Sequence, residues 1–237
     1  MPRRRRTSTG GYVYHVLNRA VGRERIFETA GDFGAFERIL DEVRQRIDAR
    51  LLAYTIMPNH WHLLLWPSAD GDLSEYMRLV TVTHTQRWHA AHGTSGTGPL
   101  YQGRFKSFPV QEDDHFYAVC RYVERNPLRA NLVEAAESWR WGSLWAWRNR
   151  GQGATLAKWP VLRPRGWCEY VNGIETEAEL AAVRETVKRG APYGESAWQS
   201  ATAKRLSLES TLRSRGRPRS RITRNRQKDS RPLFAPE

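Results

Sequence analysis

Two histidines, His60 and His62, lie two residues apart inside an apolar run that covers residues 57–66. Successive side chains of a β-strand point to opposite faces, so a strand would place both imidazoles on one face and Trp61 on the other. Imidazole is a common metal ligand, although a single buried histidine is more often a core residue. The pair therefore predicts half of a metal site, with two core residues as the alternative.

A tyrosine and an asparagine at helical spacing, Tyr122 and Asn126, follow His62 by about sixty residues and would share one helix face. The two cysteines, Cys120 and Cys168, lack metal-ligand spacing and are expected to stay free in a reducing cytoplasm. The amide oxygen of Asn126, with water and phosphate oxygens, would complete an open site for Mg²⁺ or Mn²⁺.

Tyr122 is the candidate nucleophile of such a site. A free tyrosine has a pKa of about 10 and is a weak nucleophile, but a metal-bound phosphate is more electrophilic. Tyr117 lies on the same expected helix, yet one turn further on it has Arg121, which cannot bind a metal. A core tyrosine with its hydroxyl at the surface is the alternative for Tyr122. Because Pro127 disfavours helical geometry in the preceding residue, we expect the helix to end at Asn126.

The charge of the chain favours a nucleic-acid partner. The formal net charge is +13, and only five of the 38 basic residues are lysine. Arginine offers a planar fork of donors to phosphates and stacks on bases, although a GC-rich genome would also enrich arginine. Nine basic residues and one acid, Asp229, lie between Arg213 and Arg231, and so local a basic tail indicates binding to nucleic acid.

Hydrophobic periodicity predicts four strands and three helices in the first part of the chain. The strands are expected at residues 12–19, 51–57, 60–66 and 104–110, and the helices at residues 32–49, 72–91 and 113–127. Pro58-Asn59 is a hairpin signal, and Asp72-Leu73-Ser74-Glu75 resembles a capping box. The order β-α-β-β-α-β-α predicts an α+β fold with a ferredoxin-like, mainly antiparallel sheet and helices on one face.

Composition divides the chain into five expected segments. They are a flexible basic arm at 1–10, the α+β domain at 11–149, a linker at 150–165, a small helical module at 166–212 and an arginine-rich, disordered tail at 213–237. No apolar run is long enough for a membrane span, and no signal peptide is recognisable. We expect a cytoplasmic protein of the bacterial nucleoid, either a monomer or a homodimer.

His60-Trp61-His62 resembles the His-hydrophobe-His motif of the HUH endonucleases. A wider resemblance, in order and spacing, is to the REP-associated tyrosine transposases, and it rests on residues 14–19, 57–62, 103–106 and 122–133. These proteins are single-tyrosine relatives of the small insertion-sequence transposases. The resemblance spans residues 12–147. It implies that His60, His62 and Asn126 bind a divalent ion. It also implies that Tyr122 attacks single-stranded DNA, leaving a 5′-phosphotyrosine link and a free 3′-OH.

Two groups of polar residues are candidates for binding DNA, and the first of them would lie near the expected metal site. One group alternates along the fourth expected strand and consists of Gln102, Arg104 and Lys106, for which a solvent-facing edge strand is the alternative explanation. The other group lies in the arm and consists of Arg3, Arg4, Arg5 and Arg6, for which a solvated arm is the alternative.

In the tail, Arg215-Gly216-Arg217-Pro218 resembles the core of an AT-hook, whose arginines enter the minor groove of A·T-rich DNA. Non-specific binding of phosphates is an equally good explanation for the presence of Arg215 and Arg217.

These features predict a transposase that cleaves and rejoins single-stranded DNA at hairpin-forming repeats. Another HUH enzyme, a replication initiator or relaxase, is one alternative; those often carry helicase or primase domains, of which this sequence shows no sign. A non-catalytic, domesticated DNA-binding protein is the other alternative, and it would need neither a nucleophile nor a metal.

Overall fold

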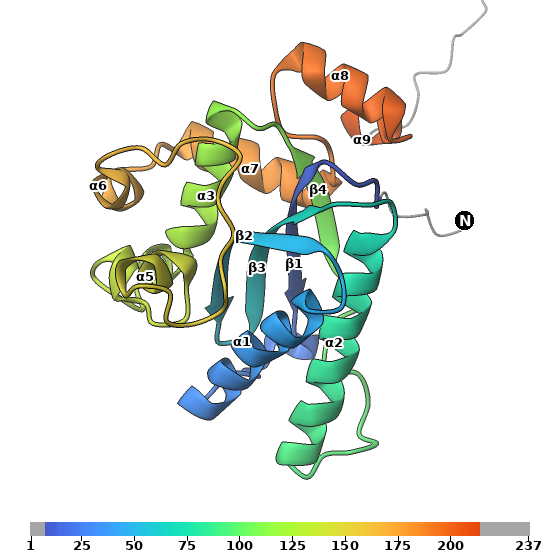
Figure 1. The fold of residues 1–237 in the computed structure, drawn as a ribbon, viewed down its shortest axis with the longest axis vertical. Coiled ribbons are helices and arrows are strands. Elements are labelled where there is room, and N and C mark those ends of the chain that lie inside the picture. The colour runs from blue at the N-terminus through green and yellow to red at the C-terminus, as the bar shows by residue number, and fades with distance from the viewer. Residues whose placement is uncertain (1–7, 214–237) are drawn as a thin grey trace, which may run out of the picture.

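The computed structural model describes residues 8–213, and its centre is a four-stranded sheet (Figure 1). The strands are β1 (Val13–Arg19), β2 (Ala49–Met57), β3 (His60–Pro67) and β4 (Lys106–Val110). They pair in the order β2-β3-β1-β4, and every pair is antiparallel. The predicted α+β fold with an antiparallel sheet is confirmed, and Pro58-Asn59 forms the turn between β2 and β3 as expected.

Helices cover both faces of this sheet, so the expectation of helices on one face is wrong. Helices α1 (Ala30–Arg44) and α2 (Asp72–Ala91) cover one face, where Trp61 and Leu63 are buried. Helix α3 (Asp114–Glu124) covers the other face, where Leu64 is buried. The strands carry apolar side chains on both faces, and each set requires its own cover. We call the second face the α3 face.

Shorter helices follow α3 along the chain. They are α4 (Asn126–Arg129), α5 (Ser143–Arg148), α6 (Trp167–Asn172), α7 (Glu177–Arg189), α8 (Ser196–Arg205) and α9 (Glu209–Leu212), with 3-10 turns at Val21–Arg23 and Ala136–Ser138. Buried side chains of α6 and α7 join the same hydrophobic cluster as α3. Helices α6 and α7 therefore pack on the helix that carries Tyr122.

Helix α1 starts earlier than the sequence predicts, whereas α2 starts at Asp72 as predicted but has a different cap. Helix α1 begins at Ala30, two residues earlier than expected, because Thr29 and Asp32 form a capping box. Helix α2 has Gly71 at its N-cap without a side-chain cap bond. The Asp72 carboxylate accepts from the backbone N–H of Ala69 instead, so the predicted capping box is wrong.

Residues 150–165, expected as a linker, run along the edge strand β2. The backbone N–H of Ala157 donates to the carbonyl of Leu51 at 2.8 Å, and Nε1 of Trp159 donates to the carbonyl of Leu52 at 2.8 Å. These bonds occupy acceptors that an uncovered edge strand would leave open. The division of the chain into separate modules stays a prediction.

Arg3 to Arg6, Arg215 and Arg217 lie outside the described residues. Within residues 8–213, no helix is long and apolar enough to cross a membrane.

Candidate active site on the α3 face

Strand β3 presents His60 and His62 on the α3 face, as the alternation of strand side chains predicts. Their ring centroids are 5.1 Å apart. The neighbouring strand β1 places Arg19 opposite His60 and Leu17 opposite His62. Paired residues of antiparallel strands point to the same face, so Arg19 lies beside the histidines.

In each histidine of the pair, Nδ1 forms a hydrogen bond with another side chain of the protein. Nδ1 of His60 donates to Oδ1 of Asn59 at 2.6 Å, and Nδ1 of His62 lies 2.9 Å from Nε2 of His15. When Nδ1 of His62 carries the proton, it donates to His15, and the Nε2 atoms of both His60 and His62 keep a free lone pair. Such outer contacts orient metal-binding histidines and fix their tautomer. The two histidines therefore fit a metal site.

Burial keeps these imidazoles neutral. Burial, with the nearby charge of Arg19, lowers the pKa of His60 to about 4. Burial also lowers the pKa of His62 well below its usual value, and the neighbouring His15 and His60 add to the shift. The pKa of His15 falls to about 3 for the same reason. A neutral imidazole is the form that binds a metal, so the site is ready for an ion at neutral pH.

Tyr122 is the tyrosine that α3 brings to the histidines. Its ring centroid lies 5.7 Å from that of His62 and 6.0 Å from that of His15, both edge-on. Tyr117 lies elsewhere on the helix, where its hydroxyl donates to the carbonyl of Leu162 and its ring contacts Trp159. Of the two tyrosines considered from the sequence, the one that contacts the His pair is Tyr122.

The phenol of Tyr122 is buried against a cation. Burial raises the pKa of Tyr122, and the charges of Arg129 and Arg184 act against that rise. The Arg129 guanidinium lies over the tyrosine ring, 4.7 Å from its centroid. A guanidinium held over a phenol ring favours the ionised form of that phenol, which is the nucleophilic form.

The end of α3 is fixed by hydrogen bonds of the two residues that follow Tyr122. Oγ1 of Thr55 on β2 donates to the carbonyl of Val123 at 2.8 Å. The buried Glu124 carboxylate accepts from Oγ of Ser143 at 2.6 Å and from Nε1 of Trp167 at 2.7 Å. Because a buried carboxylate is costly unless its oxygens are paired, these bonds hold the helix in one position against the sheet.

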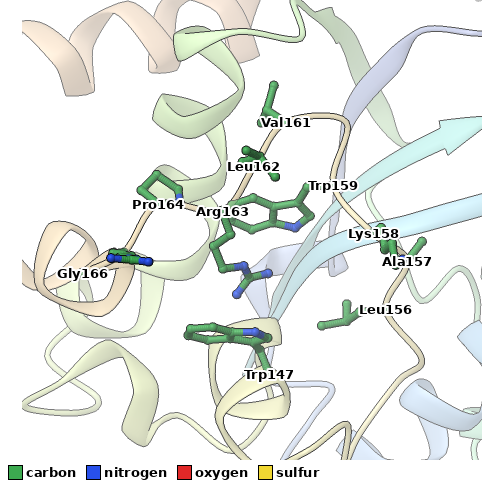
Figure 2. A pocket seen from close by; sticks show the side chains of 11 residues that line it. Trp147, Leu156, Ala157, Lys158, Trp159, Val161, Leu162, Arg163, Pro164 and Gly166 are labelled. Carbon is green, nitrogen blue, oxygen red and sulfur yellow. The ribbon is translucent and has the colours of Figure 1, made fainter.

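A positive charge also lies near that buried carboxylate. Figure 2 shows the Arg163 guanidinium between the rings of Trp147 and Trp159, from whose centroids it lies 4.3 and 3.8 Å. Burial raises the pKa of Glu124, and the charge of Arg163 acts against that rise. The three side chains of this stack line a hollow of about 670 Å³.

Three arginines spaced four residues apart attach α3 and α4 to the end of α6 and to the loop that follows it. Arg121 donates to the carbonyls of Gly173 and Ile174, both at 2.9 Å. Arg125 donates to the carbonyl of Val171 at 2.7 Å, and Arg129 forms a bidentate pair with the Glu175 carboxylate. We call these contacts the arginine ladder; it consists of Arg121, Arg125 and Arg129 with residues 171–175.

Asn126 opens α4 rather than ending α3. The helix breaks at Arg125, and Pro127 occupies the first turn of α4, a position where the missing N–H of proline costs nothing. Asn126 is half-buried. Within residues 8–213, no group of three or more His, Cys, Asp or Glu residues forms a metal site. The role of Asn126 as a third protein ligand stays a prediction.

The candidate DNA-binding residues Gln102, Arg104 and Lys106 are exposed, but the strand expected to carry them begins only at Lys106. Gln102 and Arg104 lie in the preceding bend, so the argument from strand alternation is wrong for them. All three nevertheless line one hollow of about 480 Å³ together with Arg19. The sequence does not mark Arg19 as a site residue, because its position opposite His60 follows from strand pairing.

The fold and this site define an α+β protein with paired histidines on a central strand and a tyrosine on a helix packed across them. Residues 8–126 match the family of IS200-like transposases, and the chain belongs to that family.

Among solved structures, the chain is similar to a REP-associated tyrosine transposase bound to a REP hairpin, with 18% identity and a TM-score of 0.53. The match covers 64% of this chain and 87% of the other. A proposed transposase from Deinococcus radiodurans R1 has 19% identity and a TM-score of 0.37, over 52% of this chain and 96% of the other. Curated proteins yield no match.

Proposed function

We propose that this transposase-family protein cleaves and rejoins single-stranded DNA at hairpin-forming repeats through a covalent 5′-phosphotyrosine intermediate on Tyr122. The observation that carries the proposal is the edge-on contact between Tyr122 and His62, while His60 and His62 use Nδ1, and not Nε2, for their hydrogen bonds within residues 8–213. A nucleophile and two metal ligands on one sheet face serve phosphodiester chemistry, whereas DNA binding alone needs neither.

His60 and His62, with Asn126 as third protein ligand, would hold Mg²⁺ or Mn²⁺. When bound, such an ion polarises a phosphate oxygen and orients the phosphodiester for in-line attack. The phenolic oxygen of Tyr122 attacks phosphorus, and its proton passes to solvent. The P–O3′ bond breaks, and the leaving 3′ oxygen takes up a proton as the free hydroxyl. Attack of a 3′-OH on the phosphotyrosine reverses these bonds and rejoins a strand, since the link conserves the energy of the phosphodiester.

Hairpin-bearing single strands are the proposed substrate because the similar transposase is bound to a REP hairpin. The predicted contacts of Gln102, Arg104 and Lys106 with the backbone fit this substrate, since the hollow they line is exposed on the α3 face beside His60.

The test is a covalent-adduct assay. The full-length protein is incubated with labelled hairpin oligonucleotides in Mg²⁺ or in EDTA, and adducts are separated on a denaturing gel. We expect an adduct in Mg²⁺ that is lost in EDTA and in Tyr122→Phe. The matched control is Tyr117→Phe, which removes a phenol from the same helix and should keep the adduct.

An adduct that survives in Tyr122→Phe would assign the nucleophile to another residue. DNA binding without any adduct on hairpin substrates would favour the non-catalytic DNA-binding protein.

A further inference from the structure

The hollow that contains Arg19 and Lys106 has the composition of an anion-binding site. It is lined by Leu17, Asn18, Arg19, Gln102, Gly103, Arg104, Phe105, Lys106 and Val187. Three of these residues are cations and none is acidic. Because like charges that converge without a carboxylate repel one another, an anion is the ligand that this arrangement favours.

Arg19 lines that hollow and has a donor that its neighbours leave unused. Its Nε atom is buried and has no hydrogen-bond partner among residues 8–213. An unpaired buried donor costs free energy, and a ligand oxygen would recover it. The planar fork of a guanidinium suits a phosphate, with which it forms short charge-assisted hydrogen bonds.

The strand register shows where the hollow lies relative to the histidines. On one row across the sheet, His62 pairs with Leu17, and Leu17 pairs with Lys106. On the adjoining row, His60 pairs with Arg19. Neighbouring strands lie about 4.8 Å apart, so Arg19 is one strand away from the His pair and Lys106 is about 10 Å away. The hollow thus lies over β1 and the start of β4, one strand away from the histidines of β3.

The loop before β4 is held in place against β1. The backbone N–H of Gln102 donates to the carbonyl of Arg19 at 2.9 Å, and Nδ2 of Asn18 donates to the carbonyl of Gly103 at 3.1 Å. These bonds fix the distance between Arg19 and the loop that carries Arg104. The cations of the hollow are therefore arranged in advance of any ligand, which lowers the cost of binding.

We propose that this hollow binds a backbone phosphate of single-stranded DNA next to the phosphate at the histidines, with Arg19 as its main donor and Lys106 as the second charge. The inference rests on the proposed function for the identity of the strand, and it adds a metal-independent phosphate subsite. Arg19 holds the strand in register, so that the adjoining phosphodiester meets Tyr122.

The test is DNA binding without chemistry. Anisotropy of a fluorescein-labelled oligothymidylate is measured in EDTA over a range of NaCl concentrations for the wild type and for Arg19→Gln, Arg19→Lys and Lys106→Gln. One lost phosphate contact lowers the slope of log K against log [NaCl] by about 0.7 for a single strand. We expect that change in Arg19→Gln and in Lys106→Gln, with an affinity about tenfold lower for Arg19→Gln. Arg19→Lys retains the charge and should keep the slope.

The matched control is Arg38→Gln, which removes an exposed arginine from α1 on the opposite face. Lys106 is itself exposed, so Lys106→Gln tests the hollow even if Arg19→Gln folds poorly. If Arg19→Gln and Lys106→Gln both have the salt slope and the affinity of Arg38→Gln, the proposal is overturned, whatever the adduct assay shows. If their slopes fall while the wild type forms no adduct, the phosphate subsite stands and the nuclease proposal fails.

Discussion

His15 decides which nitrogen of His62 is free. Its Nε2 atom meets Nδ1 of His62, while its own Nδ1 is buried without a hydrogen-bond partner among the described residues. If His15 accepts the proton of His62, Nε2 of His62 can bind an ion. If His15 donates instead, Nε2 of His62 carries a proton and cannot. The residue therefore positions the proposed ligand and does not itself meet the substrate.

Replacing His15 tests this role. We expect His15→Phe to weaken Mn²⁺ binding about 10- to 100-fold, because outer partners of ligating histidines have effects of that size. Binding is measured from the electron paramagnetic resonance signal of free Mn²⁺. The matched control is His84→Phe, which replaces a buried histidine that contacts Phe27 and Tyr101 on the opposite face. Equal Mn²⁺ affinity in the two variants would refute the positioning role.

Among the elements, α3 and α4 act as one support for the nucleophile because the arginine ladder ties them to residues 171–175. Arg129 belongs to this ladder and also covers the ring of Tyr122. The C-terminal half, whose role the sequence left open, thereby supplies Glu175, which holds the cation that faces the phenol. Stability of the ladder and reactivity of the tyrosine are linked through one side chain.

The variant Arg129→Gln separates the support of the helix from the effect of the guanidinium charge on Tyr122. Removal of the guanidinium should raise the pKa of Tyr122 further, because its charge opposes the effect of burial. A smaller fraction of the phenol is then ionised at neutral pH. We expect adduct formation to slow several-fold at pH 7 and to recover partly as the pH is raised. The rate is followed over pH 6–10 on hairpin substrates in Mg²⁺.

The control for that experiment is Arg87→Gln, which breaks an exposed bidentate pair with Glu42 far from the tyrosine. Its rate profile should match the wild type. An Arg129→Gln profile that is lowered equally at every pH would mean that the arginine acts only by supporting the helix.

For the whole molecule, the sequence predicted best the features that depend on local periodicity, namely strand alternation and helical spacing. Alternation placed His60 and His62 on one face, and helical spacing placed Tyr122 on a helix. The sequence did not predict that α3 crosses to the opposite face from α1 and α2, because strand β3 is apolar on both sides and periodicity cannot assign a face to a helix. Arg19 was missed for a related reason: its proximity to the histidines depends on strand register, which couples residues far apart in the chain.

The buried histidines also predict how the folded molecule responds to acid. Burial lowers the pKa values of His15 and His84 to about 3, whereas an unfolded chain has a histidine pKa near 6.5. Between these values the unfolded state binds more protons than the folded state. The stabilising contribution is therefore complete above pH 6.5 and is lost as the pH falls towards 3, by about 1.4 kcal/mol per pH unit for each histidine.

Urea unfolding at pH 7 and at pH 5 measures this loss. His84→Gln lies away from the proposed active site and should reduce the difference between the two pH values by about 2 kcal/mol, the share of one buried histidine between pH 6.5 and pH 5. The control is His115→Gln, at a partly exposed histidine that contacts Asp113. Glu124, whose pKa burial raises, acts in the opposite direction in every variant and cancels in the comparison. An unchanged pH dependence in His84→Gln would show that His84 is protonated in the folded state. Its Nδ1–H would then donate to the Tyr101 hydroxyl.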